Sequence, residues 1–114
     1  SSDLGGTWQA KEQALQRTPG STHPCPFVVE DPARPGQLYA LQSERGEKNQ
    51  IHLWKASAAD LKWEHVRLLV EVPNDKDFSY PWMTPLGGAK WFLVYYSGEK
   101  DGPNSIWGMN LSLP

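Results

Sequence analysis

The sequence has few of the residues that build disulfides or metal sites. Cys25 is the only cysteine in 114 residues, so no internal disulfide can form. No second cysteine and no pair of histidines lies at the spacing of a metal site, and we expect neither a metal nor a cofactor. Cys25 is therefore expected to be a small buried apolar residue.

Long apolar runs and strong charge are also missing. No segment approaches the roughly eighteen uninterrupted apolar residues of a membrane span. A net charge of −2 argues against nucleic acid or an anionic membrane surface as a partner. Turn-forming residues are abundant instead, with ten glycines and ten prolines beside six tryptophans. This composition predicts one small β-rich domain punctuated by turns.

Apolar segments between turn signals predict an all-β fold of about eight strands. The expected strands cover residues 8–15, 23–30, 37–43, 49–56, 63–72, 78–84, 90–97 and 104–113. The segments between them carry proline, glycine or charge, which is typical of tight turns and hairpin loops.

The first eight residues follow the pattern S-x-D-x-G-x-T-W, which is typical of a hairpin corner. Asp3 can accept hydrogen bonds from backbone N–H groups of its own turn, and Gly5 supplies a positive φ. The pattern residues are Ser1, Asp3, Gly5, Thr7 and Trp8. A degenerate second copy has Ser57, Asp60 and Trp63 in the same order, without the glycine. We expect both copies to be structural.

The two copies belong to a longer internal repeat. Trp8 and Trp63 are 55 residues apart, and other features recur at nearly that interval. They are Leu38–Ser43 with Phe92–Ser97 at 54, Asn49–Ile51 with Asn104–Ile106 at 55, and His23-Pro24 with Tyr80-Pro81 at 57. A period of this length with about four short strands per repeat predicts the blades of a β-propeller.

The turn pattern, the period and two aromatic segments together resemble the C-terminal third of an exo-α-sialidase (neuraminidase), an Asp-box (BNR repeat) propeller. The aromatic segments are Phe78–Trp82 and Trp91–Tyr96. Sialidases have six four-stranded blades, so the resemblance implies a fragment of about two blades. Residues 1–63 would hold the last strand of one blade and most of the next, and residues 64–114 the closing strand and the final blade. Sialidase-like proteins are commonly secreted or periplasmic.

The resemblance implies a catalytic role for Tyr80, at the entry of an inner strand. A sialic acid carries a carboxylate at its anomeric carbon, which would repel an anionic nucleophile. A neutral phenol avoids that repulsion, and sialidases accordingly use tyrosine where most glycosidases pair two carboxylates. Tyr80 is thus the expected nucleophile, although a core aromatic at the end of the strand would look the same in the sequence.

The substrate carboxylate is held in sialidases by three arginines, which suits the bidentate guanidinium. The third normally opens the strand after the hairpin loop, where this chain has Lys48 and Asn49, and Arg45 lies in the same loop. The other arginines and the acid/base belong to blades ahead of residue 1, so this chain alone is not expected to hold a complete site. The expected substrate-binding residues are Arg45, Asn49, His23 and Trp82, with Asp77, Lys100 and Asn104 on the same rim.

Two alternatives remain open at this stage. A non-catalytic propeller would bind glycan or protein through the same rim, and the missing third arginine favours it. A glycosidase for a neutral sugar would need no arginine clamp. The expected partners are a sialoside glycan and further blades or copies of the chain, because two blades leave apolar faces uncovered. Residue 1 falls inside a turn, so we also expect a piece of a longer polypeptide.

Overall fold

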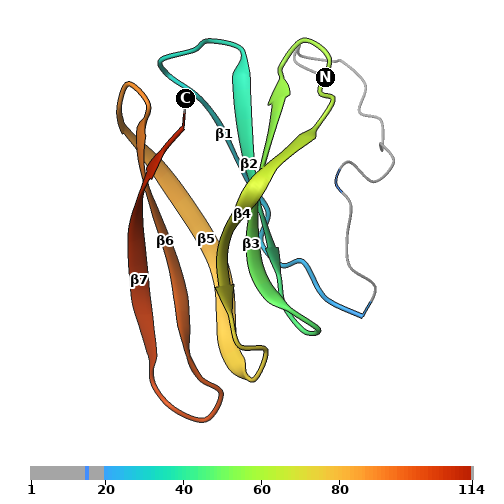
Figure 1. Ribbon diagram of the computed structural model, residues 1–114, viewed down its shortest axis with the longest axis vertical. Helices are drawn as coiled ribbons and strands as arrows, with labels where there is room; N and C mark the ends of the chain where they lie inside the picture. The colour runs from blue at the N-terminus through green and yellow to red at the C-terminus, as the bar shows by residue number, and fades with distance from the viewer. Residues whose placement is uncertain (1–14, 16–19, 114) are drawn as a thin grey trace, which may run out of the picture.

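The computed structural model describes residue 15 and residues 20–113, and this part of the chain is all-β (Figure 1). It contains two antiparallel sheets of four and three strands. The first sheet consists of β1 (Phe27–Glu30), β2 (Gln37–Glu44), β3 (Asn49–Ser57) and β4 (Glu64–Val72), and the second of β5 (Lys76–Gly87), β6 (Lys90–Glu99) and β7 (Asn104–Ser112). These seven strands confirm seven of the expected strands within a few residues.

The remaining expected strand, residues 8–15, lies almost wholly outside the described residues. The same holds for the first copy of the turn pattern, with Ser1, Asp3, Gly5, Thr7 and Trp8. The second copy is described: the backbone N–H of Lys62 donates to Asp60 Oδ1 at 3.0 Å, and that of Ala59 donates to Ser57 Oγ at 3.1 Å. Asp60 therefore accepts a hydrogen bond from its own turn, as its place in the pattern suggests.

The core lies between the two sheets, with β5 against β2 and β3. Alternate side chains of each strand point into it, because successive residues of a strand face opposite sides of the sheet. Trp91 is its largest fully buried side chain, and its ring meets that of Tyr39 edge to face at 5.6 Å. The core residues are Tyr39, Leu41, Ile51, Leu53, Val70, Phe78, Met83, Trp91, Leu93, Leu111 and Leu113.

The opening segments of the two sheets share an unusual backbone feature. Cys25 has φ 55° and Tyr80 has φ 57°, values that side-chain-bearing residues rarely adopt, and a proline follows each. At both places the pairing register shifts by one residue, which is the signature of a β-bulge. The structural repeat therefore matches Cys25 with Tyr80 at 55 residues. The expected match of His23 with Tyr80 at 57 is wrong.

The same bulge overturns the expectation that Cys25 is buried. The thiol is free and exposed. Cys25 lies two residues before Phe27, the first residue of β1, so regular strand alternation would turn both side chains into the core. The left-handed conformation of Cys25 interrupts that alternation, and its side chain points away from the core.

The repeat also relates the faces of the sheets. At 55 residues Ile51 of β3 corresponds to Ile106 of β7, yet Ile51 is fully buried and Ile106 is 76% exposed. Likewise Phe27, packed against the core, corresponds to Trp82, which is 62% exposed. The face of the first sheet that the second sheet covers is thus equivalent to the outer face of the second sheet, where Ile106 is largely exposed and Trp82 contacts Phe27.

The opposite face of the first sheet carries a polar network around His52. Its Nδ1 lies 3.0 Å from His65 Nε2, and its Nε2 lies 2.9 Å from Gln50 Oε1. Gln50 in turn donates to Glu71 Oε2 at 2.7 Å. Burial lowers the pKa of His52, the neighbouring His65 lowers it further, and Glu44 at 3.9 Å opposes the shift.

This network predicts that the protein loses stability in mild acid. The folded state binds the His52 proton less tightly than the unfolded chain, whose histidine pKa is about 6.5. The unfolded state therefore takes up more protons as the pH falls through this value, and the free energy of unfolding decreases. Urea unfolding at about pH 7.5 and about pH 5.5 measures the effect. We expect a smaller difference between the two pH values for His52→Gln, and an unchanged difference would contradict the assignment.

Candidate functional site

Three loops meet at one end of the molecule and form the candidate site. They are the β2–β3 loop, the β4–β5 connection and the β6–β7 loop (Figure 1). The turn with Asp60 lies at the other end. This is the division into two rims that the repeat predicts.

A hollow of about 480 Å³ lies among these loops. Its charged residues are three cations, Arg45, Lys76 and Lys100, and one carboxylate, Asp77. Lys76 forms an ion pair with Glu99 at 2.6 Å, which neutralises part of this charge. The balance of the lining is positive, which suits an anionic ligand. The full lining is Gly20, Thr22, Arg45, Gly46, Asn49, Asn74, Lys76, Asp77 and Lys100.

A hydrogen-bonded chain joins the two sheets at this hollow. Arg45 Nη1 donates to Tyr96 Oη at 3.2 Å, and Tyr96 Oη donates to Asp77 Oδ1 at 3.2 Å. Asn104 Nδ2 donates to the other oxygen of Asp77 at 3.0 Å. Gly98 makes this approach possible, because a Cβ there would lie 2.5 Å from Asn104 Oδ1. The polar groups of the site are therefore held by one another.

These contacts set the protonation states of the chain. The hydrogen bond from Asn104 lowers the pKa of Asp77; burial opposes this, and Tyr96, the Phe78 N–H and Arg45 lower it further. Burial raises the pKa of Tyr96, and the bond to Asp77 raises it further. At neutral pH Asp77 is thus an anion and Tyr96 a neutral donor. Among the described residues, the guanidinium of Arg45 donates one hydrogen bond, to Tyr96. A guanidinium has five N–H donors, so Arg45 retains N–H groups for a ligand.

Tyr80 lies beside this chain on the bulge of β5. Its ring stacks on that of Tyr96 with centroids 5.4 Å apart and an interplanar angle of 24°, and it is 50% exposed. The left-handed backbone of an aromatic residue costs on the order of 1–3 kcal/mol, and such strain is concentrated at functional sites. The bulge redirects Tyr80 from the alternation of the strand onto the rim.

The other predicted site residues lie in different surroundings. His23 Nδ1 lies 3.0 Å from the Ser43 carbonyl oxygen, and its Nε2 is buried without a partner among the described residues. Trp82 packs on Phe27 with centroids 4.7 Å apart and exposes the rest of its ring. Neither residue lines the hollow.

Asn49 lines the hollow but is only 1% exposed. Its Nδ2 donates to the carbonyl oxygens of Pro73 and Lys76, both at 3.0 Å. These bonds tie the start of β3 to the connection between the sheets, so the amide is already engaged in holding the loops together.

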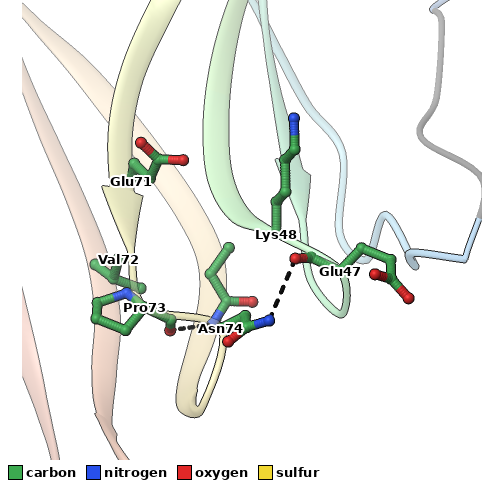
Figure 2. Close-up of a pocket in the computed structure, with 7 residues that line it drawn as sticks. Glu47, Lys48, Glu71, Val72, Pro73 and Asn74 are labelled. Atoms are coloured by element: carbon green, nitrogen blue, oxygen red, sulfur yellow. Dashed lines mark hydrogen bonds between the residues drawn. The ribbon is translucent and has the colours of Figure 1, made fainter.

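A second hollow of about 380 Å³ lies beside the same connection (Figure 2). Figure 2 shows the side chain of Asn74 reaching the Glu47 carbonyl oxygen, a bond of 3.4 Å. Glu71 and Glu47 give this hollow two carboxylates against the single cation Lys48. It is less suited to an anion than the hollow at Arg45.

Sequence reasoning missed Tyr96, the residue that links the others. Tyr96 lies within an aromatic strand, and the sequence gives no sign of its partners. The pairing of β5 with β6, in which Ser79 lies opposite Tyr96, brings Tyr96 beside Asp77. Ser79 also bridges the sheets, since its Oγ donates to Ser43 Oγ at 3.1 Å.

The described residues contain no group of three or more metal-ligating side chains. Over the same residues, no helix has the length and apolar character needed to cross a membrane. Comparison with known protein families, curated proteins and solved structures finds no match to this chain.

Proposed function

We propose that the hollow at Arg45 binds the carboxylate of a sialic acid at the rim of a sialidase-like propeller. The observation that carries the proposal is the Arg45–Tyr96–Asp77 chain with the strained Tyr80 stacked against it. An arginine, a tyrosine on a bulge and an anion-favouring hollow occur together on one rim. This combination fits a sugar acid better than a neutral sugar, which needs no cation.

In the catalytic form of the proposal Tyr80 is the nucleophile of a retaining hydrolysis. Its Oη bonds to the anomeric carbon as the bond to the leaving-group oxygen breaks. A general base takes the phenolic proton, and an acid protonates the leaving group. Water then displaces the tyrosine and regenerates the phenol. Other blades would supply the base for Tyr80, since Asp77, the carboxylate that Tyr96 contacts, is already engaged by that hydrogen bond.

A non-catalytic glycan-binding propeller is the second candidate. It is favoured by Asn49, which stands where a sialidase carries its third arginine and whose amide is engaged by loop carbonyls. In this form the same hollow recognises the sugar carboxylate, and the exposed ring of Tyr80, stacked on Tyr96, meets the sugar face.

Titration of the 114-residue chain with N-acetylneuraminic acid, followed by NMR, tests the proposal. We expect shift changes at Arg45, Asp77 and Tyr96, with a Kd on the order of millimolar. The methyl ester of the same sugar is the matched control because it lacks only the negative charge. Charge-assisted hydrogen bonds contribute about 1.5–3 kcal/mol, so the ester should bind at least about tenfold more weakly. Equal binding of acid and ester would refute carboxylate recognition. Release of a fluorogenic aglycone, lost in Tyr80→Phe, separates the catalytic form from the binding form.

A further inference from the structure

Arg45 and Asp77 carry opposite charges at the hollow, yet they do not pair with each other directly. The ion pairs of the described residues include neither of the two. Both side chains contact Tyr96 Oη instead, each at 3.2 Å. A guanidinium and a carboxylate often pair through two parallel hydrogen bonds, which are among the strongest in proteins. At this hollow a single tyrosine hydroxyl takes the place of that pair.

The hydroxyl and the carboxylate are both held in position. The ring of Tyr96 lies on β6 and stacks on that of Tyr80 with centroids 5.4 Å apart. Asn104 donates to one carboxylate oxygen of Asp77 at 3.0 Å, and the backbone N–H of Phe78 donates to the other at 3.0 Å. Asp77 therefore has its hydrogen bonds without a cation.

The backbone of Arg45 is fixed as well. Thr22 and Arg45 form an antiparallel bridge, in which each backbone N–H donates to the carbonyl oxygen of the other at 2.8 and 2.9 Å. The Thr22 hydroxyl donates to the same Arg45 carbonyl oxygen at 3.2 Å. Because the backbone is held, a change of partner for Arg45 needs only a movement of its side chain.

The pKa of Asp77 agrees with this separation of charges. The hydrogen bond from Asn104 lowers this pKa most, and the charge of Arg45 lowers it least. An arginine directly beside an aspartate typically lowers the carboxyl pKa by about 1–3. The positive charge of Arg45 is therefore largely unspent on Asp77.

We propose that Tyr96 is a positioning residue that holds Arg45 apart from Asp77 and so keeps the guanidinium available to a carboxylate ligand. Without the hydroxyl, the guanidinium would turn to Asp77 and form an ion pair. That pair would consume the charge and the N–H donors that the ligand needs. The sugar carboxylate as ligand rests on the proposed function, whereas the separation of the two charges needs no ligand.

The first test therefore uses no ligand and measures the pKa of Asp77 by NMR titration of its side-chain carboxyl carbon. Arg45→Gln is made in the unmodified chain and in Tyr96→Phe, which removes the hydroxyl and keeps the ring that stacks on Tyr80. In the unmodified chain we expect Arg45→Gln to raise the pKa of Asp77 only slightly. In Tyr96→Phe it should raise this pKa by about 1 or more, because it then removes an ion pair. Equal rises in the two proteins would overturn the proposal.

The second test is titration with N-acetylneuraminic acid. Tyr96→Phe should weaken binding about tenfold or more, because Arg45 is then engaged by Asp77. Asp77→Asn removes the competing carboxylate, so the double variant should bind within about a factor of two of Asp77→Asn alone. A double variant as weak as Tyr96→Phe would contradict the proposal. If the unmodified chain does not bind the sugar acid, the proposed function fails, and the pKa of Asp77 alone decides the role of Tyr96.

Tyr95→Phe is the matched control for the loss of a phenol hydroxyl. Tyr95 is the neighbouring residue of β6, but its side chain packs against the core. The pKa of Asp77 and the binding of the sugar acid should both stay as in the unmodified chain. Circular dichroism checks that each variant is folded. If the control changed both as much as Tyr96→Phe does, general loosening of β6 would explain the effects, and the proposal would be wrong.

Discussion

Trp91→Ala should cost a large share of the stability of this protein. Trp91 is fully buried at the centre of the core and meets Tyr39 edge to face across the two sheets. Truncation of a buried tryptophan to alanine costs about 3–5 kcal/mol, because the site refills only in part. The total free energy of unfolding of a small domain is about 5–15 kcal/mol. We expect the urea midpoint to fall by about 2 M.

Trp91→Phe is the matched control for this prediction. The indole N–H of Trp91 has no hydrogen-bond partner among the described residues, and a buried unpaired donor costs about 1–3 kcal/mol. Phenylalanine removes that donor, which stabilises the fold, but it also leaves part of the indole volume empty, which destabilises it. The two effects oppose each other, and the net loss in the free energy of unfolding should be about 1 kcal/mol. If both variants lost the same stability, the aromatic contact between the sheets would not be what holds them.

Arg45→Gln should give the largest functional effect, a weakening of sialic acid binding by roughly 10- to 150-fold. The estimate takes about 1.5–3 kcal/mol for hydrogen bonds to a charged group and about 1.4 kcal/mol per factor of ten. Glutamine keeps a neutral amide but is shorter than arginine, so the substitution removes both the charge and the hydrogen bond to Tyr96. NMR titration of the variant beside the unmodified chain measures the ratio of the two dissociation constants.

Arg34→Gln is the control for charge alone. Arg34 is exposed in the turn between β1 and β2, at the end of the sheets opposite the hollow. Its removal changes the net charge by the same amount, and binding should stay within a factor of two or so. Equal losses in both variants would mean that overall charge, and not the site at Arg45, governs binding.

The sequence by itself determined the strands and their order. Alternating apolar residues between proline- and glycine-rich turns were sufficient to predict the strand class, because that pattern is a local property of the chain. The rim that holds Arg45, Asp77 and Asn104 also followed from the order of strands and loops, since hairpin loops alternate between the two ends of a sheet. The role of Tyr80 as nucleophile came from a resemblance and stays a prediction.

Only the tertiary structure decided the register and the partners. The bulges at Cys25 and Tyr80 each add one residue to a strand, which moves every later side chain to the other face without changing the apolar pattern enough to be seen. The hairpin that joins the first two strands is shorter in the second sheet, where Trp82 pairs with Val94, than in the first, where Phe27 pairs with Leu41. The repeat therefore matches Tyr39 with Phe92, at 53 residues, and not Leu38 as the apolar pattern suggested. The chain from Arg45 through Tyr96 to Asp77 joins residues up to 51 positions apart, and only the packing of the two sheets brings them within hydrogen-bond distance.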